Sequence, residues 1–133
     1  MHRYRIFGSG AATGCRAGGY VAALIEGAVA DTLDLKKMAF PAWSRVISPA
    51  YIVGKAKVAS VGRPISVGGR TIATGDVMLL DNDGVVIVGS TDVEVHRVVT
   101  KAADIREWET KVHAMIAAGH ASADAIAEVG PMP

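Results

Sequence analysis

The sequence has little cysteine, few aromatic residues and no excess of charge of one sign. Cys15 is its only cysteine, which excludes an internal disulfide and a cysteine metal cluster and favours a small buried thiol. Lysine and arginine number 14 against 13 acidic residues, for a net charge of +1. A protein that binds nucleic acid through its phosphates normally carries a basic excess. We therefore expect no nucleic-acid partner.

Long hydrophobic runs are also missing. The longest apolar stretch, Val21–Ala30, is interrupted by Glu26 and Gly27, and it falls far short of the roughly 20 residues that span a bilayer. The basic start is not followed by a long apolar segment, so it does not resemble a signal peptide. We expect no membrane association and a cytoplasmic location. A length of 133 residues with 50% hydrophobic residues predicts one folded domain over 1–133.

The order of the predicted elements indicates an α/β fold. Short apolar runs predict strands at Tyr4–Phe7, Val21–Ile25, Ala42–Val46, Tyr51–Val53 and Lys55–Val61. Turn signals at Gly68-Gly69 and at Asp81–Gly84 predict two hairpins. Helices are predicted in the middle of Gly8–Gly19, at Asp31–Met38, at Thr91–Ala118 in one or two pieces, and at Ala121–Val129. Strands and helices followed by hairpins and then helices are typical of a mixed α/β protein.

The clearest candidate for chemistry is the glycine-rich stretch Gly8–Gly14, which follows a predicted strand. Exposed amides at the start of a helix bind anions. Three interpretations stay open here: a dinucleotide loop, a loop for another anion, and a plain tight turn. The first is disfavoured because a dinucleotide fold expects an acid about 20 residues on, and Glu26 comes too early. The four histidines are scattered, and no pair has the i, i+4 spacing of a helical metal site.

Three separated segments, taken together, resemble one family. They are Gly19–Asp31 with the following Phe40-Pro41 and Ser48-Pro49, then Val67–Asp76, then Asp81–Val88. In this order they are similar to the RraA-like family. That family contains class II pyruvate aldolases acting on 4-hydroxy-4-methyl-2-oxoglutarate and 4-carboxy-4-hydroxy-2-oxoadipate, and the regulator of RNase E activity. Its members are often mislabelled demethylmenaquinone methyltransferases.

The resemblance implies a fold, an assembly and a chemistry. The fold is a compact α/β/α domain with mixed sheets, like a swivelling domain, and with C-terminal helices. Members form homotrimers or hexamers with active sites at subunit contacts. In the aldolases a divalent cation, Mg²⁺ or Mn²⁺, polarises the 2-oxo group, and an arginine stabilises the pyruvate enolate. Decarboxylation of oxaloacetate gives the same enolate.

The family's catalytic pattern is only partly present in this chain. The pattern is an acid, twenty residues, an Arg-Asp pair and a further acid three positions after that Asp. Ser9 falls at the first acid and Ala30 falls at the arginine, whereas Asp31 and Asp34 keep the other two acids. The resemblance therefore implies no catalytic arginine, Asp31 as metal ligand, and Asp34 as a nearby acid. Glu109 falls where aldolases have a C-terminal glutamate that reaches a neighbour's metal shell.

Two hypotheses follow from this partial pattern. In the first, the chain is a diverged lyase of the pyruvate aldolase type, in which the amides of Ser9, Gly10, Ala11 and Ala12 hold the carboxylate of a small 2-oxo acid. In the second, it is a non-catalytic regulatory or binding protein, or the inactive partner of a homologous subunit. Family members usually carry a further segment before the position of Gly8, and we expect this chain to lack it.

Overall fold

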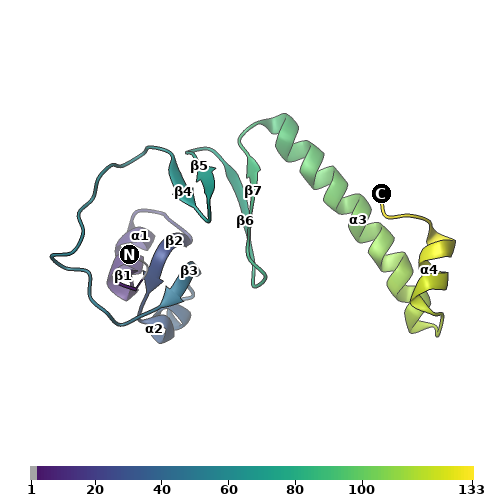
Figure 1. Ribbon diagram of the computed structural model, residues 1–133, viewed down its shortest axis with the longest axis horizontal. Helices are drawn as coiled ribbons and strands as arrows, with labels where there is room; N and C mark the ends of the chain where they lie inside the picture. The colour runs from purple at the N-terminus through teal and green to yellow at the C-terminus, as the bar shows by residue number, and fades with distance from the viewer. Residues whose placement is uncertain (1–2) are drawn as a thin grey trace. The chain divides into compact units, whose positions relative to one another are not determined.

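The computed structural model describes residues 3–133, which form two compact units divided after Thr74. The first unit contains, in chain order, β1 (Arg5–Phe7), α1 (Ser9–Ala17), β2 (Ala23–Val29), α2 (Thr32–Lys37), β3 (Ala42–Ile47), β4 (Ile65–Val67) and β5 (Arg70–Ile72). The second contains β6 (Val77–Leu80), β7 (Val85–Gly89), α3 (Asp92–Ala117) and α4 (Ser122–Val129) (Figure 1). None of the helices in this described part is both long and apolar enough to cross a membrane.

The first unit is built on a parallel sheet with the strand order β1-β2-β3. Two helical crossovers, α1 and α2, make the parallel pairing possible because each returns the chain to the same end of the sheet. A core cluster of Ala12, Val29, Leu35 and Phe40 joins the two helices to β2, and the Phe7 ring stacks on Phe40 with 6.0 Å between the centroids. The sheet and its two helices therefore share one hydrophobic core.

Parallel pairing also brings the ends of β1 and β2 together. Phe7 is opposite Val29, and the amide of Ala30 donates to the carbonyl of Phe7 over 3.0 Å. The residues that follow the two strands, Ser9 and Asp31, consequently meet at one edge of the sheet. That edge is the place where open α/β sheets bind their ligands.

The Glu26 side chain connects the β4–β5 hairpin to this sheet. The turn of the hairpin uses Gly68 and Gly69 at φ of 59° and 77°, a left-handed geometry that glycine adopts at little cost. The Glu26 carboxylate on β2 accepts from the Gly68 amide at 2.9 Å and is paired with Arg45 on β3. Glu26 therefore links the hairpin turn to two strands of the sheet.

The second unit combines a hairpin with a long helix. Asp81 closes the turn between β6 and β7 by accepting from the amides of Asp83 and Gly84, and β7 packs against α3. Helix α3 begins with a capping box in which the Thr91 side chain and Glu94 each satisfy the other's backbone amide. The predicted region Thr91–Ala118 is thus a single helix of 26 residues.

Most predicted elements are confirmed, including the mixed α/β class, both hairpins and the C-terminal helices. The strand predicted at Lys55–Val61 is wrong because that segment forms no strand and all its residues are exposed. The strand predicted at Val21–Ile25 begins later and runs on to Val29, and Val21 is 83% exposed. Glycine at position 27 does not end it, since Gly27 is buried where the Ile6 side chain approaches closely.

Trp108 on α3 makes a hydrogen bond to the C-terminal segment, and the loss of this bond should lower the stability of the protein measurably. Its indole Nε1 donates to the Gly130 carbonyl over 2.8 Å from a half-buried position. We expect Trp108→Phe to lower the free energy of unfolding by at least about 1 kcal/mol, since it deletes the hydrogen bond and replaces the indole with a smaller aromatic ring. Urea unfolding followed by circular dichroism measures this.

A control for Trp108→Phe is Lys111→Gln on the same helix. It removes the exposed ion pair between Lys111 and Glu107, for which we expect a loss of no more than about 0.5 kcal/mol. If the two variants unfold at the same urea concentration, the Trp108 hydrogen bond does not have the role assigned to it.

Candidate functional site

Asp31 stands at the junction between β2 and α2 in an unusual backbone conformation. Its φ of 56° and ψ of 36° place it in the left-handed region, which few residues other than glycine adopt and which aspartate tolerates better than most. It is the N-cap residue of α2, yet its side chain makes no bond to that helix. The carboxylate is turned instead towards the start of α1. Such local strain is typical of functional positions.

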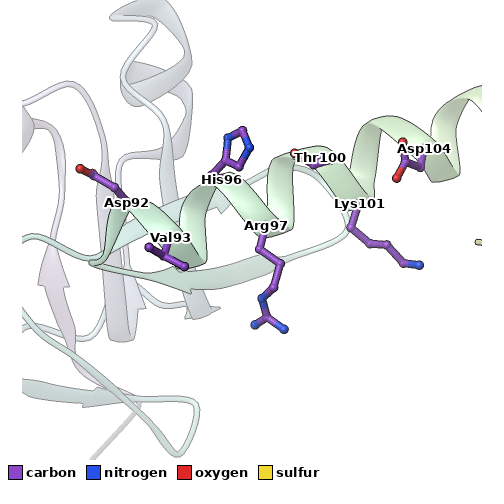
Figure 2. Close-up of a pocket in the computed structure, with 7 residues that line it drawn as sticks. All are labelled: Asp92, Val93, His96, Arg97, Thr100, Lys101 and Asp104. Atoms are coloured by element: carbon purple, nitrogen blue, oxygen red, sulfur yellow. The ribbon is translucent and has the colours of Figure 1, made fainter.

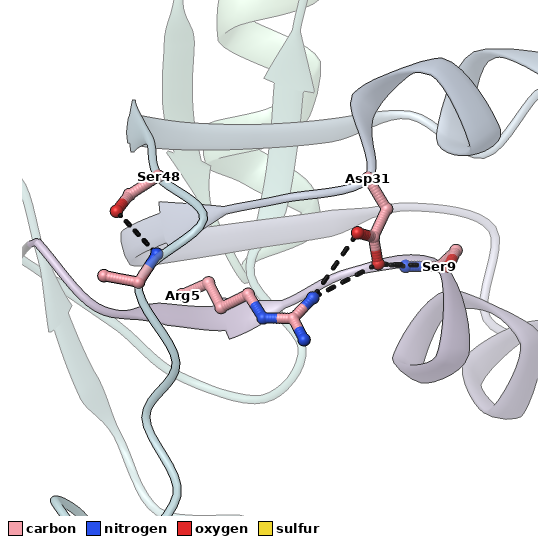
Figure 3. Close-up of polar contacts among 5 residues, drawn as sticks. Arg5, Ser9, Asp31 and Ser48 are labelled. Atoms are coloured by element: carbon pink, nitrogen blue, oxygen red, sulfur yellow. Dashed lines mark hydrogen bonds and ion pairs between the residues drawn. The ribbon is translucent and has the colours of Figure 1, made fainter.

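Three donors from two segments meet the Asp31 carboxylate (Figure 3). The Ser9 amide and the Ser9 hydroxyl donate to Oδ2 over 3.0 and 3.1 Å. The Arg5 Nη1 atom lies 3.4 Å from Oδ1 and 3.5 Å from Oδ2. Each of the two charged side chains is about one-third exposed. The pair is thus anchored in the protein and still accessible to a small solute.

These contacts keep Asp31 ionised. Hydrogen bonds from the Ser9 amide and hydroxyl, followed by the Arg5 charge, lower the pKa of the Asp31 carboxyl below its ordinary value. Donors that bond to the charged form of a carboxyl favour that form. The ionised form of Asp31 is therefore favoured, and it gives Arg5 a negative neighbour.

Arg5 is positioned by β1 and by the segment after β3. Its amide donates to the Ala50 carbonyl over 2.8 Å, and its guanidinium lies 4.6 Å above the centre of the Tyr51 ring. The polar contacts to Asp31 use Nη1 alone. A guanidinium has five N–H donors in a planar fork, so the donors on Nε and Nη2 remain for a ligand. Sequence reasoning missed this residue. The strand predicted at Tyr51–Val53 does not form, and only an isolated bridge pairs Tyr51 with Arg5.

A pocket opens beside this pair. Its volume is about 320 Å³, and it is lined by Arg5, Ile6, Phe7, Gly8, Gly10, Ala11, Asp31, Tyr51, Ile52 and Val53. This volume is at the lower end of the range for ligand pockets, so it suits a small metabolite. Two charged side chains among apolar side chains and backbone atoms give a ligand a fixed orientation.

The four amides predicted to hold a carboxylate have three different environments. The Ser9 amide donates to Asp31, and the Ala12 amide donates to the Gly8 carbonyl as part of the helix. Ala12 is completely buried in the core. Gly10 and Ala11 line the pocket, and their amides belong to the first turn of α1, where backbone donors have no partner within the helix. Of the four predicted amides, those of Gly10 and Ala11 therefore remain as candidates for binding a carboxylate.

The other predicted positions lie outside the pocket lining. Ala30 is buried, at 7% exposure, and brings no charge. Asp34 is on α2, where its carboxylate is 3.4 Å from Lys37 Nζ. Glu109 is an exposed residue of α3 in the second unit. Among these residues, the structure brings together Asp31, Ser9 and the two amides of Gly10 and Ala11.

The donor set around Asp31 does not fit the divalent cation that the resemblance implies. Mg²⁺ and Mn²⁺ prefer several oxygen ligands in octahedral geometry. Over residues 3–133 there is no group of three or more His, Cys, Asp or Glu side chains placed to hold a metal ion. The Asp31 carboxylate is already engaged by a guanidinium and by Ser9. A cation at this carboxylate would lie beside the positive charge of Arg5.

A second hollow runs along α3 and has no comparable convergence of groups. It is lined by Asp92, Val93, His96, Arg97, Thr100, Lys101 and Asp104, all from this one helix. Figure 2 shows Arg97 and Lys101 extending to one side while His96 and Asp92 extend elsewhere. Because the charged groups do not point towards a common centre, the pocket at Arg5 and Asp31 is the better candidate site.

A comparison with models of protein families shows to which family the chain belongs. Residues 1–87, about two-thirds of its length, match the model of the RraA-like family, described as Aldolase/RraA. The chain belongs to the RraA-like family. The family includes aldolases and regulators, so membership places the protein among them. The matched residues contain the whole pocket at Arg5 and Asp31.

Two solved structures are similar to this RraA-like protein. An uncharacterised protein from Pseudomonas syringae pv. tomato strain DC3000 is 23% identical, with a TM-score of 0.83, over 94% of this chain and 62% of the other. A protein described among novel cellulases from microbes associated with the gut ecosystem is 26% identical, with a TM-score of 0.71, over 82% of this chain and 48% of the other. The chain thus spans less than two-thirds of each neighbour, and the first likeness shows a shared fold.

Proposed function

We propose that this RraA-like chain binds a small 2-oxo acid in the pocket beside Arg5 and Asp31 and cleaves a carbon–carbon bond to release pyruvate. The observation that carries the proposal is the guanidinium of Arg5 beside Asp31. It supplies a positive charge at a site where Ala30 supplies none. Membership in a family that includes aldolases supports the same reaction class.

The pocket offers complementary partners for each part of such a substrate. The amides of Gly10 and Ala11 suit the carboxylate next to the oxo group, because the first turn of a helix attracts anions. The donors on Arg5 Nε and Nη2 suit the oxo oxygen. The apolar side chains of Phe7 and Ile52 offer contacts to the carbon chain. A planar acid of a few carbon atoms matches the volume of about 320 Å³.

Oxaloacetate illustrates the reaction that these groups support. The bond between C3 and C4 breaks, carbon dioxide leaves, and the electron pair moves into the C2–C3 bond and onto the C2 oxygen. The resulting enolate oxygen is negative and is stabilised by the Arg5 guanidinium, since donors aimed at developing charge lower the barrier. A proton from water then adds to C3 and gives pyruvate. Asp31 acts as a positioning residue that holds Arg5 in place.

A non-catalytic binding or regulatory protein is the second candidate. The observation that favours it is the absence of charge at two positions of the family's catalytic pattern. The Ser9 hydroxyl donates a hydrogen bond to Asp31, and Ala30 is buried. An inactive subunit that assembles with a homologous active chain would likewise be non-catalytic by itself. The homotrimer or hexamer that the family implies stays a prediction, and light scattering on the purified chain tests it.

The direct test uses the complete chain with oxaloacetate and with oxalate, a stable mimic of the pyruvate enolate. Pyruvate is followed with lactate dehydrogenase and NADH against a control without protein, and oxalate binding is followed by calorimetry. We expect oxalate to bind and pyruvate to form above the control. Oxalate binding without turnover would favour the second candidate, and failure to bind oxalate would contradict the proposed 2-oxo acid site.

A further inference from the structure

The Asp31 carboxylate is already paired with a positively charged side chain, Arg5, which lies outside the family's catalytic pattern. Arg5 Nη1 lies within 3.5 Å of both carboxylate oxygens, and Ser9 fills the remaining side of Oδ2 with two hydrogen bonds. We propose that the Arg5 guanidinium takes the place of a divalent metal ion at Asp31, so that this site binds its 2-oxo acid without a metal. The ligand in this statement rests on the proposed function, whereas the exclusion of the metal rests on Arg5 and Asp31 alone.

The first argument is competition for the same oxygens. A metal ion bound to Asp31 would need a lone pair on Oδ1 or Oδ2, and it would face a guanidinium held beside both atoms. Two positive charges at one half-buried carboxylate repel each other strongly, because screening by water is incomplete there. Arg5 is held in place by the Tyr51 ring and by the pairing of its backbone with Ala50. Withdrawal of its side chain would give up the contact with the Tyr51 ring as well.

The second argument is the shortage of other ligands. The Ser9 hydroxyl donates to Asp31, so it adds no negative charge to the site. Asp34 is paired with Lys37 on its own helix. Within the part of the chain that the structure describes, no set of three metal-binding side chains exists. Mg²⁺ is commonly held by one or two carboxylates with water in its other positions, and the one carboxylate available here is already paired with Arg5.

The third argument is that a guanidinium can stabilise negative charge on the ligand, as a metal ion would. It carries a permanent positive charge, and its planar fork matches a carboxylate or a carboxylate with an adjacent oxo group. In this pocket Asp31 contacts only Nη1, and the guanidinium lies over the Tyr51 ring. The unused edge is thereby available to a ligand. Arg5 thus restores a cationic group that Ala30 does not supply.

Titration with Mn²⁺ alone, followed by the relaxation rate of water protons, tests the exclusion of the metal. The complete chain is compared with Arg5→Gln, which frees the Asp31 carboxylate, and with Arg63→Gln, which makes the same charge change on an exposed loop residue. We expect Arg5→Gln to bind Mn²⁺ at least about tenfold more tightly than the other two, because the competing charge is gone. Arg5→Lys keeps the charge and should resemble the unchanged protein.

Equal Mn²⁺ affinity in the unchanged protein and in Arg5→Gln, whether strong or undetectable, would overturn the proposal. Circular dichroism establishes that the variants are folded, and Arg5→Met, which also removes the charge, serves if Arg5→Gln does not fold. Calorimetry with oxalate in the presence of excess chelator is the second measurement. Binding there supports a metal-free site, and binding that appears only after Mg²⁺ is added would overturn the proposal. Failure of oxalate to bind under either condition contradicts the proposed function, while the Mn²⁺ comparison still decides the inference.

Discussion

Replacing Arg5 with glutamine is expected to lower kcat/KM for pyruvate formation from oxaloacetate by about 10²–10³-fold, the usual cost of losing one positioned donor to a developing oxyanion. Glutamine keeps hydrogen-bonding atoms but loses the positive charge that lies beside Asp31 in the pocket. Lysine at position 5 restores the charge without the planar fork, so we expect partial recovery. The coupled assay for pyruvate, run over a range of oxaloacetate concentrations, separates the effects on kcat and KM.

Arg63→Gln is the matched control for this prediction. It removes the same charge from an exposed residue outside the pocket lining, and we expect its kinetics to equal those of the unchanged chain. If Arg5→Gln is as active as Arg63→Gln, then Arg5 does not stabilise the enolate and the reaction proposed for this pocket is wrong.

Gly8→Ala is expected to disable the same site through Asp31. A methyl group at Gly8 would stand 2.5 Å from Asp31 Oδ2 and 3.7 Å from Arg5 Nη1. The backbone at Gly8 is extended, with φ of −166°, so alanine brings no conformational strain of its own. The carboxylate must turn away from Ser9, and Arg5 loses its anchor. We expect kcat/KM to fall by about 10²-fold, since small misplacements in an active site have effects of this size.

Gly14→Ala provides the control within the same helix. A methyl group at Gly14 meets no atom within 4 Å, and alanine in a helix is more favourable than glycine by about 0.5–1 kcal/mol. This variant should be fully active and slightly more stable in thermal unfolding. Equal activity of the Gly8 and Gly14 variants would show that the position of the Asp31 carboxylate is unimportant for the reaction.

The fold was largely predictable because local signals agreed with the tertiary structure. The turn at Gly68-Gly69 and the capping residue Thr91 fix a hairpin and a helix start by short-range chemistry. The segment Lys55–Val61 alternates like a strand, yet no neighbouring strand pairs with it and it stays exposed. Alternation alone does not supply a pairing partner, and this explains why the prediction was wrong.

The site was only half predictable, for a physical reason. The resemblance pointed to Asp31 and Ser9 because their spacing of 22 positions is a pattern within the sequence. Arg5 reaches Asp31 through the parallel register of β1 with β2, and no motif encodes that register. Nor does any local signal show that Tyr51 would lie under the Arg5 guanidinium. The compensating cation could therefore be found only in three dimensions.

Pyruvate release from oxaloacetate by the unchanged chain in excess chelator tests the central claim most directly. Because Arg5 supplies the positive charge at Asp31, we predict turnover above the protein-free control. When Mg²⁺ replaces the chelator, the rate should rise only by the amount that Mg²⁺ produces without protein. Turnover that disappears in chelator and returns with Mg²⁺ would contradict the account. Asp31 would then hold a metal ion, and Arg5 would have to leave it for the reaction to occur.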